Sequence, residues 1–135
     1  MQIHFEFELE EQLLTAITSG VWQSHEDSAV MCKTIGEVAV RHQRERVMWL
    51  DDTTGRSPTV LESHMSGEAA ADAFRGVALA YVPRYAMNPE LRQRIDFLAA
   101  VAKNRGLRGQ ICLEEEDARQ WLYSLPSSYF AMCDF

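Results

Sequence analysis

Residues 88–122 read NPELRQRIDFLAAVAKNRGLRGQICLEEEDARQWL, and this stretch predicts a helix, a short strand and a second helix. Asn88 can accept a hydrogen bond from a free N–H of the first turn, and Pro89 fits the first helical position. Gly106 supplies the left-handed residue that ends the helix. Apolar residues recur between them at helical spacing and predict a face that packs on a sheet: Leu91, Ile95, Leu98 and Ala102.

The second half of the stretch predicts a buried strand followed by another helix. Gly109–Leu113 is short and apolar at three successive positions, as an interior strand is. Glu114–Asp117 place four acids at the start of the next helix, where the helix dipole favours negative charge. Its buried face is formed by Ala118, Trp121 and Leu122. Helices that alternate with buried strands indicate a parallel sheet.

The N-terminal residues predict an antiparallel hairpin. Apolar and polar residues alternate over residues 3–10, which is the pattern of a strand with one buried face. A polar turn at residues 10–12 leads to a second strand over residues 13–19, and Gly20 is where we expect the chain to leave that strand.

The middle of the chain continues the alternation of helix and strand. Ser24 is the expected N-cap of a helix over residues 25–42, with His42 on its apolar face. Three further segments follow in order, namely a buried strand over 46–50, a polar loop over 51–56 and a helix that begins at Ser57-Pro58. Gly67 is expected to interrupt this helix, and residues 76–82 form the next buried strand.

These segments together predict one α/β domain over residues 1–123. Its sheet is expected to be five-stranded and mostly parallel, with an antiparallel N-terminal strand and about four helices. The tail over residues 124–135 is apolar at Tyr129, Phe130, Met132 and Phe135. We expect it to dock on the domain or on a partner. That partner could be a second copy of the chain, which would make the protein a homo-oligomer.

Composition bounds the class of protein. The net charge of −7 argues against nucleic-acid binding in general, although residues 75–108 carry +5 and the rest of the chain −12. The start of the chain lacks a signal-peptide pattern, and no window is apolar enough for stable membrane insertion. Cys32, Cys112 and Cys133 lack a C-x-x-C spacing and are expected to be free thiols. These features predict a cytoplasmic protein.

Signatures of catalysis, metal binding and cofactor binding are absent from the sequence. It contains no G-x-S-x-G, P-loop, dinucleotide-binding glycine pattern or H-E-x-x-H. The four histidines are scattered without the spacing of metal ligands. Asp51-Asp52 follows a predicted strand, where α/β proteins often place function, but as a pair of carboxylates it is also ordinary turn chemistry.

An apolar pocket with a basic rim is a second kind of candidate site. Its aromatic and apolar members would be Trp22, Tyr81, Tyr85, Met87 and Phe97, for each of which core packing is the alternative. Arg84, Arg92 and Arg94 are close in sequence to these residues and would attract an anion. This combination predicts an anionic, lipid-like or small amphiphilic ligand.

The order of elements resembles the STAS family, and within it the SpoIIAA-like subgroup of small stand-alone bacterial proteins, with a general architecture like that of CRAL-TRIO-like lipid carriers. The resemblance covers roughly residues 3–123. It rests on five stretches that match the family in position: the glycine that ends the second strand, the acidic end of the third strand, the next apolar strand, the end of the long helix, and the acidic start and apolar face of the last helix. These are Gly20, Trp49-Leu50-Asp51-Asp52, Val77–Val82, Phe97 to Gly106, and Glu114–Asp117 with Trp121-Leu122. None of these is a catalytic signature.

The resemblance implies a non-catalytic regulatory or binding module that acts through a protein partner or a small ligand. In phosphorylated members of the family a serine begins the helix after the strand that matches residues 46–50. The nearest equivalent here is Ser57, beside Thr53 and Thr54, and the chain reads Asp51-Asp52-Thr53-Thr54-Gly55-Arg56-Ser57-Pro58 where those members have a D-S-x-G-like turn. Residues 51–57 are therefore a candidate regulatory or phosphate site. The alternative is a hydrolase or transferase that uses the same loop.

Overall fold

The computed structural model describes residues 3–126. The elements follow in the order β1 (Ile3–Leu9), β2 (Leu13–Trp22), α1 (His25–Arg41), β3 (Arg46–Gly55), α2 (Val60–Ala73), β4 (Ala78–Pro83), α3 (Pro89–Asn104), β5 (Arg108–Ile111) and α4 (Glu115–Ser124). The predicted tail lies mostly outside the described residues.

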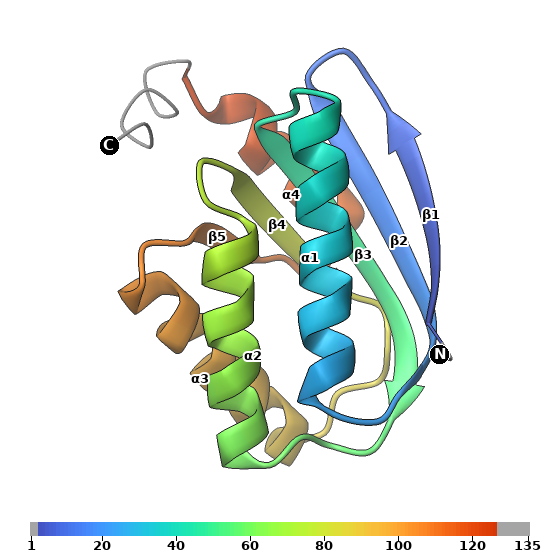
Figure 1. Cartoon of the computed structure of the whole chain (residues 1–135), viewed down its shortest axis with the longest axis vertical. Coiled ribbons are helices and arrows are strands. Elements are labelled where there is room, and N and C mark those ends of the chain that lie inside the picture. Colours follow the sequence, from blue (N-terminus) through green and yellow to red (C-terminus); the bar gives the residue numbers. More distant parts are fainter. Residues whose placement is uncertain (1–2, 127–135) are drawn as a thin grey trace.

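The sheet has five strands in the order β1-β2-β3-β4-β5, with β1 antiparallel to β2 and every other pair parallel. Helices α1, α2 and α3 pack side by side on one face, and α4 packs on β3 and β4 from the other face (Figure 1). The predicted mostly parallel sheet with an antiparallel N-terminal strand is confirmed. Because the crossover helices run antiparallel to the strands, α1, α2 and α3 all begin at the carboxyl edge of the sheet.

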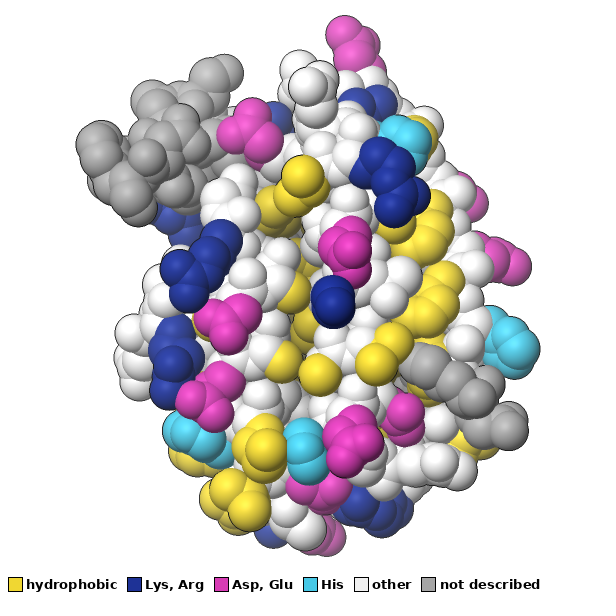
Figure 2. Space-filling view, in the orientation of Figure 1, with side chains coloured by type: hydrophobic (Ala, Val, Ile, Leu, Met, Phe, Trp, Pro, Cys, Tyr) yellow, Lys and Arg dark blue, Asp and Glu magenta, His cyan; other side chains and the backbone are white. Residues whose placement is uncertain are grey.

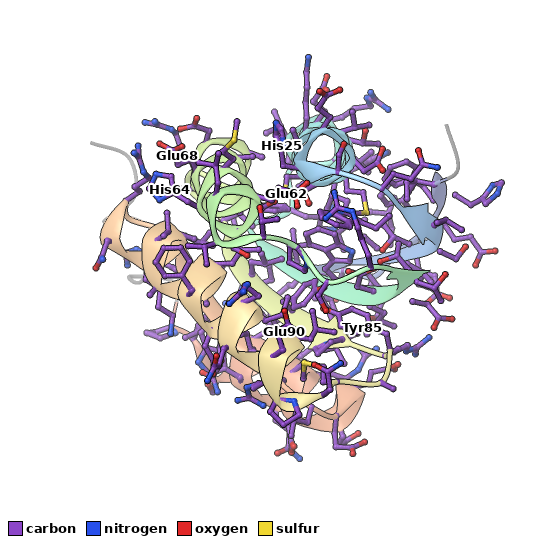
Figure 3. The ribbon with its side chains drawn as sticks, turned by 90° about the horizontal axis from the view of Figure 1, so that it is seen from below. His25, Glu62, His64, Glu68, Tyr85 and Glu90 are labelled. Carbon is purple, nitrogen blue, oxygen red and sulfur yellow. The ribbon has the colours of Figure 1, made fainter. Side chains whose placement is uncertain are left out.

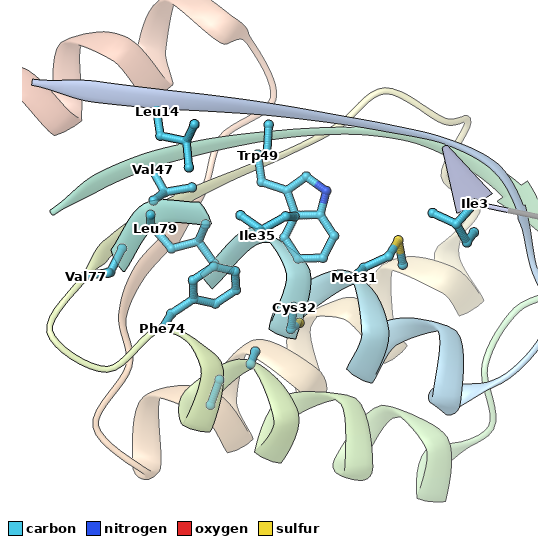
Figure 4. Close-up of a cluster of buried hydrophobic side chains, with 14 residues drawn as sticks. Ile3, Leu14, Met31, Cys32, Ile35, Val47, Trp49, Phe74, Val77 and Leu79 are labelled. Atoms are coloured by element: carbon cyan, nitrogen blue, oxygen red, sulfur yellow. The ribbon is translucent and has the colours of Figure 1, made fainter. Parts of the chain in front are cut away.

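Each face of the sheet carries its own core, as the side-chain alternation of strands requires. Trp49 lies in the larger core, between the sheet and the helices α1 and α2, where its ring packs against that of Phe74 (Figure 4). Its ring also packs edge-on against that of Tyr81. On the opposite face Met48 and Leu50 pack with Leu122 of α4. Continuous apolar runs in β3 and β4 therefore reflect burial on both faces, as predicted.

Two strands are longer than the sequence predicts. β2 continues beyond Gly20 to Trp22, and β3 continues through residues 51–55, so the predicted polar loop at 51–56 is wrong. The two strands pair in parallel over their whole length, from Leu13 opposite Arg46 to Trp22 opposite Gly55. The parallel pairing supplies backbone hydrogen-bond partners to residues 51–55. It thereby outweighs the preference of their polar side chains for a loop.

The start of α2 also differs from the prediction. Its N-cap is Thr59 rather than Ser57, and Gly67 does not interrupt the helix. Thr59 and Glu62 form a complete capping box. The Glu62 N–H donates to the Thr59 hydroxyl at 3.1 Å, and the Thr59 N–H donates to the Glu62 carboxylate at 3.0 Å. This reciprocal cap satisfies two free N–H groups at the start of the helix. The helix therefore begins after Thr59 and not at Ser57-Pro58.

The other helix ends are closer to the prediction. Ser24 caps α1, and Asn88 caps α3 by accepting a hydrogen bond from the Leu91 N–H at 2.8 Å, with Pro89 in the first turn. His42 is an exception, because α1 ends at Arg41 and the His42 side chain is exposed rather than part of the apolar face.

Residues 75–108, which carry the net positive charge noted in the sequence, do not form a continuous positive surface. Figure 2 shows Lys and Arg side chains interspersed with Asp and Glu on the face that it draws. The arginines of residues 75–105 are ion-paired: Arg75 with Asp72, Arg84 with Glu115, Arg92 with Asp96, Arg94 with Glu90 and Arg105 with Glu68. Within residues 3–126, no helix has the length and apolar character needed to cross a bilayer.

We expect Glu62→Gln to destabilise the domain in a pH-dependent way. Hydrogen bonds from Arg56 and from the Thr59 backbone lower the pKa of Glu62 from 4.5 to about 2. Because the pKa is depressed in the folded state, this contribution is present above about pH 4.5 and is lost as the pH falls toward 2. Urea unfolding should show a loss of about 1 kcal/mol at pH 7 that shrinks at pH 3.

Glu90→Gln is the matched control for this prediction. Glu90 lies in the first turn of α3 but belongs to no capping box, because Asn88 provides the cap there. We expect this variant to cost only a few tenths of a kcal/mol at either pH. An equal loss for Glu62→Gln at pH 7 and pH 3 would contradict the role of the carboxylate.

Candidate functional site

A cavity of about 320 Å³ lies between α3 and the sheet face that α1 and α2 also cover. We call it the α3 cavity. Its walls are largely apolar and include Trp22, Met31, Trp49, Leu79, Ile95 and Leu98. It follows α3 from Leu91 in the first turn to Lys103 in the last. In Figure 3, Tyr85, Glu62 and Glu90 lie at the end of the domain where α2 and α3 begin.

The cavity lies beside a close contact between α3 and α2, and several small side chains line it. A Cβ atom on Gly67 of α2 would lie only 2.7 Å from the Leu98 carbonyl oxygen, so the two helix backbones nearly touch. Toward the sheet, Ala99, Ala102 and Gly109 line the space and are too small to fill it. The predicted apolar face of α3 therefore borders a void, and within α3 only Ile95 and Ala102 are fully buried.

Among the residues of the described chain that line the cavity, Asp51 is the one carboxylate, and it is buried. Its side chain is only 4 % exposed. One of its oxygens accepts hydrogen bonds from the Thr18 hydroxyl at 2.8 Å, the Thr53 hydroxyl at 2.9 Å and the Thr53 N–H at 3.1 Å. The other oxygen accepts a hydrogen bond from the Tyr81 hydroxyl. Four donors thus compensate the cost of burying this charge.

Two tyrosines extend this network along the cavity wall. The Tyr81 and Tyr85 hydroxyls lie 2.9 Å apart, and both side chains line the cavity. On the other side of Asp51, the Trp49 indole N–H donates to the Thr18 hydroxyl at 2.8 Å. We refer to Thr18, Asp51, Thr53, Tyr81 and Tyr85 as the Asp51 network. It combines residues of β2, β3 and β4 with the segment before α3.

Three titratable groups on the cavity wall, the Cys32 thiol and the two phenols of Tyr81 and Tyr85, hold their protons strongly. Burial, with a smaller contribution from the Asp51 charge, raises the pKa of the Cys32 thiol to about 12. The same two causes raise the pKa of both tyrosines above the ordinary value of 10. The thiol and the phenols therefore stay protonated at neutral pH, so none of them is an activated nucleophile.

Arg56 and Trp22 contribute to the wall of the cavity near the end of β3. The guanidinium lies 5.1 Å from the centre of the Trp22 ring and donates to both carboxylate oxygens of Glu62 at 2.7 Å. It also donates to the Gln23 carbonyl oxygen at 2.8 Å. Arg56 thus ties the end of β2 to the start of α2, and its charge is already paired.

The structure places the predicted regulatory residues on different surfaces. Asp51 and Thr53 are buried in the network, whereas Asp52 points to the other face of the sheet and is exposed. Thr54 lines the cavity and donates to the Gly20 carbonyl oxygen at 3.3 Å. Ser57 is half-buried in the segment before α2 and does not cap that helix.

The predicted pocket residues also divide into two groups. Trp22, Tyr81 and Tyr85 line the cavity. Phe97 is 40 % exposed beside His64 on the outside of α3, and Met87 is not part of the lining. The three predicted arginines do not line the cavity either. Arg84 and Arg92 are ion-paired at the surface, while Arg94 donates to the Pro58 carbonyl oxygen at 3.1 Å.

Sequence reasoning missed Thr18 and most of the apolar lining. Thr18 is one of two threonines in β2, and its place directly opposite Asp51 follows from the parallel register of β2 and β3, which the sequence does not show. The lining residues Leu79, Leu98 and Leu107 gave no signal either, since core residues and cavity residues have the same pattern in a sequence.

The geometry gives no support to catalysis by residues 51–57. No hydrogen bond joins Asp52, Ser57 and a histidine within residues 3–126. Moreover, His64 faces Glu68 at 3.5 Å on the outer surface of α2. Nor does that part of the chain contain a group of three or more His, Cys, Asp or Glu side chains that could hold a metal ion.

Comparison with known proteins identifies likenesses in structure. No protein-family model matches the sequence, and no curated protein matches it either. Among solved structures, the chain is similar to an anti-sigma factor antagonist from Mycobacterium paratuberculosis, with a TM-score of 0.59, 13 % identity and coverage of 90 % of this chain and 94 % of that chain. It also matches an uncharacterized protein with a SpoIIAA-like fold from Shewanella loihica PV-4, with a TM-score of 0.49, 13 % identity and the same coverage. At this identity the first likeness establishes the fold alone.

Proposed function

Given that this chain has a STAS-like α/β fold, we propose that it is a non-catalytic regulatory domain that binds a small, largely apolar molecule in the α3 cavity. The observation that carries this proposal is the cavity itself. Its volume of about 320 Å³ is at the lower end of the range of small-molecule sites. Like such sites, it combines apolar walls with a few fixed polar groups, here the Asp51 network.

The regulatory part of the proposal draws on the similar solved structure, which is named an anti-sigma factor antagonist. A protein partner would then sense the domain, and a bound molecule would alter what that partner meets. The position of the cavity supports this coupling, because its occupant would touch the inner face of α3 while the outer face of the same helix is exposed. A ligand shifts such an equilibrium by its differential affinity for the two states.

Filling the cavity should weaken ligand binding, and Ala99→Trp is the variant that tests this. Ala99 lines the cavity, so an indole at this position would occupy the space that a ligand needs. N-phenyl-1-naphthylamine, an uncharged apolar dye, should bind the unmodified protein with a rise in fluorescence. We expect the variant to bind it at least about tenfold more weakly.

Ala100→Trp is the matched control, because Ala100 neighbours Ala99 on α3 but is exposed. This variant should bind the dye as the unmodified protein does. Thermal unfolding monitors whether both variants are folded, and Ala99→Leu replaces Ala99→Trp if the larger side chain prevents folding. The proposal fails if the dye does not bind the unmodified protein, or if the folded Ala99 variant binds it with unchanged affinity.

A further inference from the structure

The hydrogen bonds of the Asp51 network run in one direction, and that direction selects the ligand. A phenol hydroxyl has one proton to donate. The Tyr81 proton is donated to the Asp51 carboxylate, so the contact of 2.9 Å between the two phenols requires Tyr85 to donate to the Tyr81 oxygen. The proton of Tyr85 is thereby used as well, and the chain of donors runs from Tyr85 through Tyr81 to Asp51.

The state of the carboxylate supports this direction. Three of its four donors are threonine groups, and the Thr18 hydroxyl itself accepts a hydrogen bond from Trp49. Every hydrogen bond at Asp51 therefore ends on a carboxylate oxygen.

The oxygen of Tyr85 is left as an acceptor. Within the part of the chain that the structure describes, its single hydrogen bond is the one to Tyr81. A phenol oxygen can accept hydrogen bonds in addition to donating one. Because Tyr85 lines the α3 cavity, a molecule in the cavity can reach this end of the network with a donor group.

From this arrangement we propose that the α3 cavity selects an apolar molecule that ends in a hydrogen-bond donor, namely an alcohol or an amine, and rejects a carboxylate of the same length. The inference rests on the proposed function, because it names the chemical class of the ligand for the same cavity. A carboxylate has no proton to donate to Tyr85 and would be repelled by the buried Asp51 charge. Arg84, Arg92 and Arg94 do not line the cavity. Two other cations do: Arg56, whose charge is paired with Glu62, and Lys103, which lies in the last turn of α3, at the opposite end of that helix from Tyr85. Neither therefore presents an unpaired positive charge beside Tyr85 to offset this repulsion.

The pKa of each phenol is consistent with a fixed direction at neutral pH. Burial is the largest cause that raises the pKa of both tyrosines, and the Asp51 charge is the second. Both phenols therefore keep their protons well above neutral pH, and the direction of the network does not change under ordinary conditions.

Competition between matched probes tests the selection. Decanol, a methyl ketone of equal chain length and decanoate fill the same apolar space but present a donor, an acceptor and an anion, respectively. Each is used to displace N-phenyl-1-naphthylamine from the full chain at pH 7. We expect decanol to bind roughly fivefold more tightly than the ketone and at least about tenfold more tightly than decanoate.

Tyr85→Phe should remove the difference between decanol and the ketone, because it deletes the acceptor and keeps the ring. Tyr123→Phe is the matched control, since Tyr123 is an exposed tyrosine on α4 that does not line the cavity. This variant should keep the preference of the unmodified protein. If Tyr85→Phe does not fold, the order of the three probes on the unmodified protein decides alone.

The possible outcomes separate the two proposals. Failure of the dye and of every probe to bind would overturn the proposed function. Binding in which the ketone or decanoate equals or exceeds decanol would leave a ligand-binding domain but overturn the donor selection. Binding with the expected order that Tyr85→Phe does not alter would also overturn it, because the preference would then arise elsewhere.

Discussion

Replacing Asp51 with alanine is expected to lower the free energy of unfolding by about 3 kcal/mol or more. The substitution removes the acceptor of four hydrogen bonds, so four donor groups on Thr18, Thr53 and Tyr81 lose this partner. Each unsatisfied buried donor costs about 1–3 kcal/mol, and relief from burying the carboxylate charge offsets part of the sum. Urea unfolding at pH 7 measures the loss.

Asp52→Ala is the control, because Asp52 is adjacent in sequence but exposed on the opposite face of the sheet. It should change the free energy of unfolding by no more than about 0.5 kcal/mol. Similar losses for the two variants would contradict the Asp51 network as a buried, satisfied cluster. The comparison also separates the two carboxylates, which are equivalent in the sequence.

Gly67→Ala is expected to destabilise the domain by about 2 kcal/mol, although alanine is the better helix former by about 1 kcal/mol. The added Cβ would lie 2.7 Å from the Leu98 carbonyl oxygen and 2.9 Å from the Val101 Cβ. Neither contact can be relieved by a side-chain rotation, so α3 must move away from α2. Thermal and urea unfolding of the variant measure the cost of that displacement.

Ala100→Gly is the reference variant, because it measures the effect of an alanine-glycine exchange on helix stability alone. Ala100 is exposed on α3, where only helix propensity decides, and the substitution should cost about 1 kcal/mol. If Gly67→Ala instead stabilised the protein, the close approach of α2 and α3 would be absent. The glycine would then be an ordinary weak point in a helix.

The fold could be predicted because its signals are local. Each element is indicated by residues within it or next to it. Examples are the alternation of polar and apolar residues in β1, the continuous apolar runs of β3 and β4, and the Asn88-Pro89 cap of α3. Where the prediction fails, a contact with a distant part of the chain outweighs the local sequence signal. Residues 51–55 have loop-like side chains, but pairing with β2 holds their backbone in the sheet.

The site was only partly predictable. Trp22, Tyr81, Tyr85 and Asp51 were candidates on the basis of residue type and position, and they line the cavity. The prediction for Arg84, Arg92 and Arg94 rests on their nearness in sequence to the aromatic residues, and nearness in sequence does not reveal which acids lie opposite them in the fold. Glu115, for example, is 31 residues from Arg84 yet lies 2.9 Å from it.

By itself the sequence determined the order of the elements, the antiparallel N-terminal hairpin, the parallel sheet and the apolar face of α3, because periodicity and capping act within a few residues. Only the tertiary structure decided that α3 meets α2 through Gly67 beside a cavity, and that the Thr18, Asp51 and Tyr81 side chains meet. These outcomes depend on distances between residues remote in sequence. Small side chains leave the cavity, and the strand register sets the polar cluster on its wall.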